Sequence, residues 1–404
     1  MDANRSVKSI AIIGGGASAL FFAAAIDPDK FDVTIYEKNK TLGRKFLVAG
    51  DGGFNLTHSE SIETMIERYT PSLFLKESLT HFDNTSLRNL LSEIGIETFI
   101  GSSKRVYPEK GVKPIEVLNA ILDRIKNKGV EIKFEQTWTG WSEDKLSFND
   151  SDEVNADIVV YALGGASWKV TGSNGLWISY FKQKNIGIVP FQASNCAFEV
   201  KWSQDFLIKN EGLPLKNIEI TSANKSQRGE VVITSYGLEG NAIYALSPEI
   251  RKQLSNTDTA EIFIDLKPSL LITEIKNRLS SSSKNRTITL SEEIKLSKVQ
   301  VSLLKSFLTK EEYMDDEILS RRIKQFPVTI SGLSEIDEAI STFGGVDLSE
   351  VSSSYELKNM HNHYCIGEML NWDAPTGGYL IQACYSMGAF VAELLNEEST
   401  TLKE

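Results

Sequence analysis

The chain has 404 residues, carries a net charge of −11 at pH 7 and has a sequence pI near 5.1. This length allows two or three domains with ample cores, and the negative charge disfavours a nucleic-acid partner. The cysteines Cys196, Cys365 and Cys384 are too few and too scattered for a disulfide framework. No apolar run reaches the ~18 residues of a membrane-spanning helix, so we expect a protein of the reducing cytoplasm without a membrane partner.

Three glycines near the start separate an apolar run from a run of small residues, in the segment SIAIIGGGASALFFAAAI. Residues 10–13 predict a strand buried on both faces, and residues 17–26 predict a helix whose N-terminal N–H groups can face a phosphate. Gly14 allows a tight turn, Gly16 lets a pyrophosphate approach the backbone, and Ala19 permits close packing of the helix on the strand. This pattern is typical of a dinucleotide-binding fold.

An acidic residue follows at the spacing that a dinucleotide site requires. Glu37 ends the apolar run DVTIYEK about 20 residues after the turn, where its carboxylate can accept hydrogen bonds from ribose hydroxyls. The alternative is a secretory signal, since Arg5 and Lys8 precede an apolar run that ends in three alanines. The glycines inside that run and the strand directly after it argue against cleavage.

The middle of the chain alternates between helical and extended patterns. Residues 62–91 are mostly helical in pattern, and IEVLNAILDRIKNKG predicts an amphipathic helix that ends at Gly129. The runs VEIKFEQTWTGW and KLSFND predict a small antiparallel meander, and ADIVVYALGG predicts another buried strand that leads into glycines.

The character of the sequence changes near Pro190. Four short runs between there and residue 267 predict a separate β-rich unit, and residues 268–325 are helical in pattern. Buried-strand patterns then return, and the chain closes on the glycine-led apolar helix TGGYLIQACYSMGAFVAELLN. We therefore expect an α/β nucleotide-binding fold built from the two chain ends, with an insertion between them.

Glycine turns recur after four apolar segments, at residues 14–16, 50–53, 164–165 and 377–378. Ligands of a doubly wound sheet lie at the carboxyl ends of its strands. One such turn serves one phosphate, whereas several converging turns suit a long cofactor that contacts backbone along its length. The sequence therefore favours FAD over NAD as the bound ligand.

Several blocks of the sequence resemble a bacterial family of NAD(P)/FAD-dependent oxidoreductases labelled aminoacetone-oxidase-like or bile-acid-reductase-like. These blocks are GRKFLVAGDGGFNLTHSE, RVYPEK, ALGGASW, GEVVITSYGLEGNAIYALS, FGGVDL and GEMLNWDAPTGGYLIQACYSMG, and they occur in the family's order over nearly the whole chain. The resemblance implies a Rossmann-type FAD-binding domain from residues 1–190 and 326–404. It also implies an inserted β-barrel-like domain at 191–267 and a small helical subdomain at 268–325.

The resemblance further implies roles by matching position. The first turn would hold the pyrophosphate, Glu37 the adenosine ribose, and the last helix would point its N-terminal dipole at the flavin N1–C2=O edge. The implied FAD-binding residues are Gly14, Gly16, Ala17, Ser18, Ala19, Glu37, Lys38, Arg44, Lys45, Gly52, Gly53, Asn55, Leu56, Ala162, Gly164, Gly367, Glu368, Gly377, Gly378, Tyr379 and Leu380. The catalytic residues stay unidentified.

The sequence also departs from the commonest pattern of this family. Gly53 and Phe54 replace an arginine–cysteine pair before NLT, Leu163 replaces a threonine, Ser235 replaces a histidine, and Asn241 stands where proline is frequent. This sequence resembles more closely a sub-branch of the family with GGLNLTH, ALGGASW and YGLEG blocks. The known substrates of the wider family are therefore a poor guide to the substrate of this chain.

Some residues admit two interpretations. Lys45 could support the flavin electrostatically or be a solvated surface lysine, and His58 could approach the flavin or face water. Tyr236 could donate a proton or pack in a core, and Trp168 and Trp372 could wall the substrate side or simply pack.

Three alternating residues, His361, His363 and Cys365, have a metal-ligand spacing, but no fourth ligand is evident and we expect no metal. Cys365 and Cys384 lie too far apart in sequence for a dithiol–flavin relay of the disulfide-reductase kind.

These patterns together predict an FAD-dependent oxidoreductase that transfers a hydride to or from a small organic substrate, with NAD(P)H as a transient electron donor. A flavin oxidase that uses O₂ and a non-catalytic flavin-binding scaffold or redox sensor are the alternatives. A flavin-dependent RNA-modifying enzyme is a more distant one, because the acidic charge opposes it. No obligate protein partner is evident.

Overall fold

The computed structural model describes residues 7–48 and 53–401, and it divides into two compact units. The first unit contains the described residues up to Ala193 and from Ile340 onward, and the second spans Ser194–Ala339. Each unit has its own cluster of buried apolar side chains. The two units are therefore two domains in the physical sense of separate cores.

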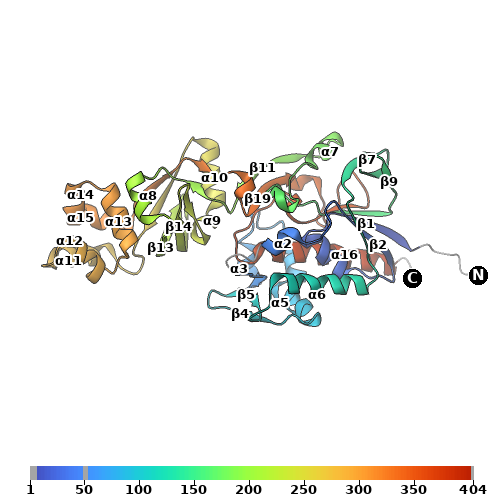
Figure 1. The fold of residues 1–404 in the computed structure, drawn as a ribbon, viewed down its shortest axis with the longest axis horizontal. Coiled ribbons are helices and arrows are strands. Elements are labelled where there is room, and N and C mark those ends of the chain that lie inside the picture. The colour runs from blue at the N-terminus through green and yellow to red at the C-terminus, as the bar shows by residue number, and fades with distance from the viewer. Residues whose placement is uncertain (1–6, 49–52, 402–404) are drawn as a thin grey trace, which may run out of the picture. The chain divides into compact units, whose positions relative to one another are not determined.

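The first unit is built on a five-stranded parallel sheet (Figure 1). Its strands, in spatial order, are β20 (His363–Cys365), β10 (Ile158–Tyr161), β1 (Lys8–Ile13), β2 (Phe31–Glu37) and β6 (Glu131–Phe134). The central strand β1 is flanked on both sides, and residues 10–13 are buried, as a central parallel strand requires. Strands from both halves of the chain thus share one sheet, as predicted.

Helix α1 (Ala17–Ala25) packs against the last helix, α16 (Tyr379–Thr401). The contact is close because Gly388 has no side chain: a Cβ there would lie 2.7 Å from the carbonyl oxygen of Ser18 and 2.8 Å from the backbone nitrogen of Phe22. The opening and closing segments of the chain therefore lie side by side.

The remaining elements of the first unit surround this centre. The expected amphipathic helix is α6 (Pro114–Asn127), and Gly129 follows it with φ +77°. The other helices of four or more residues are α2 (Arg44–Val48), α3 (Ile62–Ile66), α4 (Lys76–His81), α5 (Asn84–Glu93) and α7 (Ile178–Gln183). One small sheet has the strand order β3 (Thr57–His58), β5 (Arg105–Pro108) and β4 (Thr98–Ile100). A second has the order β7 (Trp138–Ser142), β8 (Lys145–Phe148) and β9 (Asp152–Val154). In a third, β11 (Ile188–Ser194) pairs with β19 (Ser341–Val346).

One part of the predicted meander is wrong. The run that begins at Val130 starts with β6, which pairs in parallel with β2 at the edge of the main sheet, and only β7, β8 and β9 are antiparallel. The reason is that α6 crosses over the sheet and returns the chain in the parallel direction.

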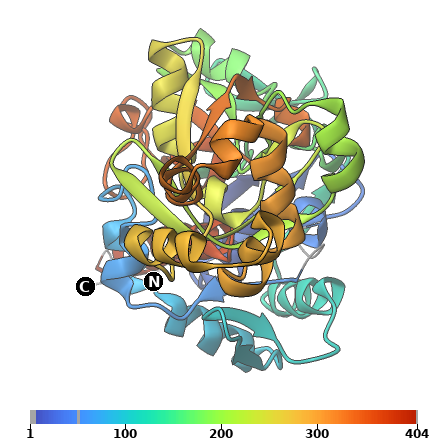
Figure 2. The same cartoon turned by 90° about the vertical axis from the view of Figure 1, so that its left-hand side faces the viewer.

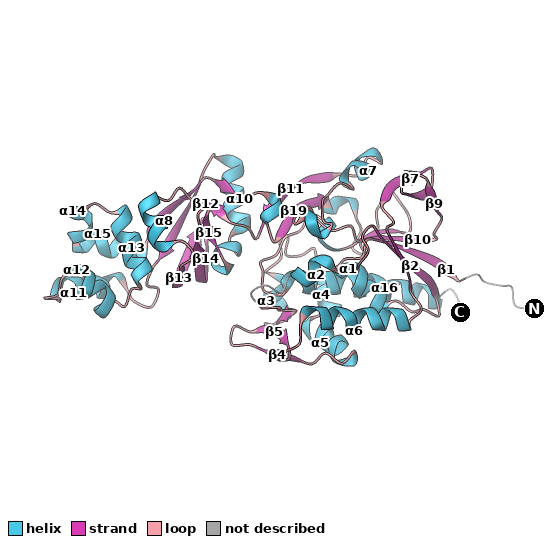
Figure 3. Cartoon of the chain, viewed as in Figure 1, coloured by secondary structure: helices cyan, strands magenta, loops and turns pink. Residues whose placement is uncertain are grey.

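The second unit is a seven-stranded antiparallel sheet with helices (Figures 2 and 3). In spatial order its strands are β17 (Phe326–Ile330), β16 (Ala260–Asp265), β13 (Pro214–Ser222), β14 (Lys225–Ile233), β15 (Gly237–Glu239), β12 (Phe198–Glu199) and β18 (Gly332–Leu333). Only Ser331 separates the two strands at the ends of this order, so the chain itself joins them, as in the expected barrel-like domain.

Its helices follow the predicted pattern, with the helical subdomain at α11–α15. They are α8 (Gln204–Asn210), α9 (Asn241–Tyr244), α10 (Ser247–Asn256), α11 (Ile272–Ser281), α12 (Arg286–Ile288), α13 (Lys298–Phe307), α14 (Lys310–Met314) and α15 (Asp316–Lys324). The predicted return to the first domain at residue 326 is too early, because β17 completes the second sheet by pairing with β16. The chain returns only at Ile340.

Candidate functional site

The first glycine turn joins β1 to α1, and its three glycines meet different surroundings. Gly14 has φ +97°, and a Cβ there would lie 2.6 Å from the carbonyl oxygen of Ala162 on the neighbouring strand. Gly16 is the residue that precedes α1, and no atom of residues 7–48 or 53–401 lies within 4 Å of the position of its Cβ. The turn thus leaves open space in front of the first N–H groups of a helix, which is where a pyrophosphate binds.

The predicted ribose acceptor, Glu37, lies at the end of β2 and is 7% exposed. The backbone N–H of Gly15 donates to its Oε2 at 2.7 Å, and the N–H of Asn39 donates to its Oε1 at 2.8 Å. Glu37 therefore fixes the first turn. Because each carboxylate oxygen can accept two hydrogen bonds, Oε2 keeps a position for a ribose hydroxyl. Lys38 is partly buried, and this burial lowers its pKa.

Other predicted glycine turns are also closely packed against distant parts of the chain. A Cβ on Gly367 would overlap Oγ of Ser18 in the first turn of α1, and a Cβ on Gly165 would overlap Oγ1 of Thr342. A Cβ on Gly378 would lie 2.5 Å from Cα of Thr57. Gly378 is required because the backbone of Thr57 approaches it closely, and Gly367 and Gly165 because side chains from distant parts of the chain pack directly on them.

Lys45 connects two of these turns. Its Nζ donates to Oγ of Ser167 at 2.7 Å and to Oε2 of Glu368 at 2.9 Å. Glu368 in turn accepts from the backbone N–H of Thr342 through Oε1. The Lys45 side chain is 27% exposed, so it is not a free surface lysine. The neighbouring Arg44 donates to Oδ1 of Asn39 and to the carbonyl of Val170.

The loop predicted to lie near the flavin is described from Gly53 onward, and Gly52 lies outside the described residues. Gly53 has φ +114°, the side chain of Asn55 donates to its carbonyl, and Leu56 is buried. At the end of β10, Gly164 has φ +70° and its carbonyl accepts from Nε1 of Trp177.

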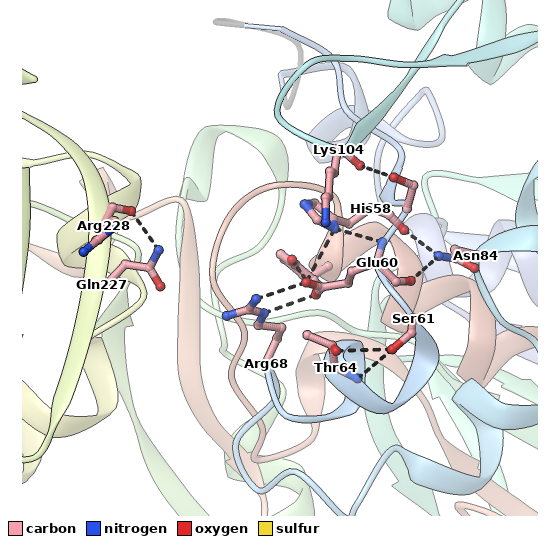
Figure 4. A network of polar contacts seen from close by, with 11 residues as sticks. His58, Glu60, Ser61, Thr64, Arg68, Asn84, Lys104, Gln227 and Arg228 are labelled. Atoms are coloured by element: carbon pink, nitrogen blue, oxygen red, sulfur yellow. Dashed lines mark hydrogen bonds and ion pairs between the residues drawn. The ribbon is translucent and has the colours of Figure 1, made fainter. Parts of the chain in front are cut away.

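A polar network at the start of α16 escaped the sequence analysis (Figure 4). Glu60 accepts two hydrogen bonds from Arg68, at 3.2 and 3.0 Å, and one from the hydroxyl of Tyr379 at 2.7 Å. Burial alone would raise the pKa of Glu60, but the hydrogen bonds from Arg68 and Tyr379 outweigh it and lower that pKa. The carboxylate therefore stays ionised and fixes the first residue of α16.

His58 belongs to this network rather than to the solvent. Its ring stacks on that of Tyr379, with centroids 5.4 Å apart, and its Nδ1 accepts from the backbone N–H of Glu60. Burial lowers the pKa of His58, so the ring is neutral at pH 7.

Arg105 lies against the glycine turn that opens α16. A Cβ on Gly377 would lie 3.3 Å from Nε of Arg105. Arg105 is partly buried, and within residues 7–48 and 53–401 its side chain forms no ion pair or hydrogen bond. The block RVYPEK pointed to this strand but not to this side chain, because a contact between β5 and Gly377 spans most of the chain.

Other candidates have other roles. Trp372 is 2% exposed and donates to the carbonyl of Gly367, so it supports that turn from inside. Tyr236 is 57% exposed, which excludes the core-packing interpretation. Nδ1 of His363 shares a hydrogen bond with the Tyr161 hydroxyl, and His361 pairs with Glu356. The described part of the chain contains no group of side chains that could hold a metal ion.

The residues present fit FAD. The first turn offers open space at a helix N-terminus, the ribose acceptor has an unused lone pair, and the turns after β10 and at Gly367 adjoin it from distant segments. Such a backbone-lined site suits a long dinucleotide. In the described residues, no helix is both long enough and apolar enough to cross a membrane.

Comparison with known proteins identifies the family of the chain. A family profile described as the HI0933-like protein Rossmann domain matches residues 8–394. The chain is 26% identical over 398 residues to a ribosomal RNA dihydrouridine synthase of Haemophilus influenzae, covering 93% of this chain and 95% of that protein. It is 24% identical over 414 residues to a 3-dehydro-bile acid delta(4,6)-reductase of Clostridium scindens, covering 95% and 97%.

A solved structure shares the fold. The 3-ketosteroid delta1-dehydrogenase from Sterolibacterium denitrificans superposes with a TM-score of 0.50 at 10% identity, over 97% of this chain and 100% of that one. The profile match covers nearly all of the chain and confirms the predicted fold class. The chain therefore belongs to the HI0933-like family of FAD-dependent, Rossmann-fold oxidoreductases.

Proposed function

We propose that this chain uses bound FAD to reduce a carbon–carbon double bond that is conjugated to a carbonyl group. The observation that carries the proposal is the meeting of glycine turns from both ends of the chain, with Gly367 against Ser18 and open space in front of Gly16. Bound FAD supplies two-electron hydride chemistry at its isoalloxazine ring.

The names of two relatives support this class of substrate. Dihydrouridine is uridine with two hydrogens added to a ring double bond that is conjugated to a carbonyl, and one relative is a ribosomal RNA dihydrouridine synthase. In a 3-dehydro bile acid the carbonyl is at carbon 3, and the double bonds named by delta(4,6) are conjugated to it. The two names share a reaction although their substrates differ in size and charge.

Arg105 is the residue that we assign to the substrate carbonyl. Negative charge moves onto the carbonyl oxygen as a conjugated double bond accepts a hydride, and a fixed cationic donor stabilises that charge. The Arg105 guanidinium is always charged, is partly buried, and is not engaged by any carboxylate of the described residues. It lies beside Gly377, where the last helix begins.

The nearby hydroxyls are already engaged. The Tyr379 hydroxyl donates to Glu60, and the Tyr69 hydroxyl donates to the carbonyl of Tyr379. Neither is free to protonate a substrate. We propose that water supplies the proton that completes the reduction.

The test is anaerobic photoreduction of the purified, FAD-loaded protein, followed by mixing with one oxidant at a time. The oxidants are a cyclic enone, uridine, a uridine-containing RNA, an amino-ketone, NAD(P)⁺ and O₂. The proposal predicts that an enone or uracil ring restores the oxidised flavin spectrum in a 1:1 ratio with saturated product. NAD(P)H, our proposed donor, should reduce the oxidised protein.

The alternatives give different results. Rapid reaction with O₂ and release of peroxide, with no reaction toward conjugated carbonyls, would show an oxidase. A flavin that none of these compounds turns over would show a scaffold or sensor. Protein that binds no FAD after loading would contradict the whole proposal.

A further inference from the structure

The second unit carries a hollow that the flavin site does not use. It has a volume of about 500 Å³ and is lined by residues 216–218, 228–230 and 267–269, from β13, β14 and the loop after β16. The pairing of β13 with β14 shifts register between Leu215 and Ile218, and Asn217 has φ +55°. Such a bulge redirects side chains, which places Lys216 at this hollow.

Three cations line the hollow against one carboxylate. They are Lys216, Arg228 and Lys267, and the carboxylate is Glu230. Lys216 lies 3.7 Å from Glu230, and both side chains are more than half exposed, so this pair contributes little. Arg228 pairs with Glu219 at 2.7 Å through Nε, and its side chain is 73% exposed, so its terminal nitrogens remain accessible.

Lys267 is the least compensated of the three. It is partly buried and has no ion pair with any carboxylate in the described part of the chain, and its Nζ donates only to the carbonyl of Lys295 at 3.3 Å. Burial lowers the pKa of Lys267, and the nearby charges of Arg278 and Lys295 lower it further. Arg278 is held in place by a hydrogen bond to the carbonyl of Glu293. Asp265, whose Oδ1 accepts from the backbone N–H of Lys267, pairs with Lys324 rather than with Lys267. An anion at the hollow would therefore relieve the repulsion among Lys267, Arg278 and Lys295.

The negative net charge of the chain does not prevent local binding of an anion. Charges are screened over about 8 Å at physiological ionic strength, so a ligand at this hollow experiences mainly its lining residues. Asn217 and Ser269 add neutral polar groups to the lining, and Ile218 and Pro268 add apolar surface. An open hollow with several cations and neutral donors suits phosphate groups on a flexible strand better than an enclosed apolar ligand.

We propose that this hollow binds the phosphodiester backbone of a single-stranded RNA segment. The inference rests on the proposed function, because uridine within RNA is one member of the proposed substrate class. Within that class, the inference favours uridine in RNA over free enones as the substrate. The expectation of no nucleic-acid partner came from the net charge alone, whereas this proposal comes from the local arrangement of Lys216, Arg228 and Lys267.

The test measures binding rather than turnover. Fluorescence anisotropy of a labelled, uridine-containing single-stranded RNA is followed with the FAD-loaded protein at several salt concentrations. The variant is the triple substitution Lys216→Gln, Arg228→Gln and Lys267→Gln. The matched control removes three exposed lysines of the same unit outside the hollow, by Lys201→Gln, Lys209→Gln and Lys252→Gln, with the same change in net charge.

We expect the hollow variant to bind RNA at least ~10-fold more weakly and its salt slope to fall by roughly 2, since each phosphate contact on a single strand contributes about 0.7. The control should bind like the original protein, and reduction of a free enone should be unchanged in both. Equal weakening in both variants, or no RNA binding by the original protein, would overturn the proposal.

A further arm separates RNA from free phosphate. Inorganic phosphate and uridine monophosphate are titrated against the bound RNA. We expect neither to displace RNA at concentrations near that of the oligomer, because one phosphate engages only part of the hollow. If the monophosphate alone binds as tightly as RNA, the site serves a small phosphorylated ligand and the RNA proposal is wrong. If the original protein binds RNA but reduces no conjugated carbonyl compound, that result would count against the proposed function alone.

Discussion

At the residue scale, the glycines of the first turn have separable roles. Gly14 is required by the fold, because a Cβ would meet the carbonyl oxygen of Ala162 and its φ is +97°. Gly16 has ordinary backbone angles, and in the described part of the chain no atom lies within 4 Å of its Cβ position. A side chain at Gly16 would therefore enter the space that we assign to the cofactor.

Gly16→Leu is therefore expected to abolish FAD binding while the protein stays folded. The pyrophosphate would meet the new side chain, whereas the unfolding free energy should change by no more than about 1 kcal/mol, since only the residue before the helix changes. Flavin absorbance per chain after FAD loading and the apo-protein's chemical unfolding curve measure the two effects. Gly14→Ala serves as the contrast and should destabilise the apo-protein itself. Full flavin content in Gly16→Leu would contradict the assigned phosphate site.

A change at Arg105 is expected to affect the reaction more than the fold, because its side chain forms no ion pair or hydrogen bond with the described residues. Arg105→Gln should retain FAD and lower kcat/KM for a conjugated carbonyl substrate by roughly 10- to 100-fold, the worth of one charge-assisted hydrogen bond. Steady-state kinetics measure this, with the neighbouring Lys104→Gln as control. Unchanged kinetics in Arg105→Gln would remove Arg105 from the reaction.

His363 makes stability depend on pH. Burial lowers its pKa to about 4, from an ordinary value near 6.5, and its ring contacts the Tyr161 hydroxyl at 2.9 Å. Between these two pKa values the unfolded chain binds a proton that the folded chain does not. Stability is therefore full above pH 6.5 and falls as the pH drops toward 4.

The expected loss from this one group is at most about 3 kcal/mol over that window. His363→Gln should flatten this part of the curve of unfolding free energy against pH. His361→Gln is the matched control, because that side chain is 86% exposed. If both variants leave the slope between pH 4 and 6.5 unchanged, burial of His363 is not its cause.

At the scale of elements, the contact of α1 with α16 joins the two ends of the chain. Gly388→Val should separate the helices, because the clash is with backbone atoms of Ser18 and Phe22 that cannot rotate away. We expect a loss of about 1–3 kcal/mol in stability and weaker FAD binding, since α1 carries the proposed phosphate site. Thermal unfolding and FAD titration test both, and Glu398→Ala, an exposed change on α16, should affect neither. Wild-type FAD affinity in a destabilised Gly388→Val protein would uncouple this packing from the site.

The elements also show what the sequence can and cannot predict. The first turn, the position of Glu37 and helix α6 could be predicted from the sequence, because each depends on a local pattern with a physical requirement, such as the positive φ of Gly14. The Glu60–Arg68–Tyr379 network could not, because Glu60 and Tyr379 are 319 residues apart. Their meeting depends on the tertiary fold, which no local pattern encodes.

The pairing partner of a strand could likewise not be predicted from the sequence. The alternation in the run from Val130 is the same for a parallel edge strand as for a meander, and only the crossover of α6 decides that β6 joins β2. The run at residue 326 has a buried-strand pattern that suits either sheet, and its pairing with β16 decides that it belongs to the second. Periodicity thus predicts the strand but not its neighbour.

At the scale of the whole molecule, the separate cores predict separate stabilities. Since the proposed FAD site lies in the first unit, adding FAD should raise only that unit's unfolding temperature. Calorimetry of the apo-protein should show two transitions, one of which moves with FAD. Leu303→Ala, in the second core, should lower the unfolding free energy of the second unit by about 2–5 kcal/mol and so move the other transition to a lower temperature. A single transition that shifts as a whole in both experiments would show that the units unfold together.

The central claim is that backbone turns from the beginning and the end of the chain hold one FAD molecule. A crystal structure of the FAD-loaded protein tests it most directly. The account predicts the pyrophosphate at the N–H groups around Gly16 and the isoalloxazine ring beside Gly377 and Arg105. FAD bound away from either of these turns would contradict it.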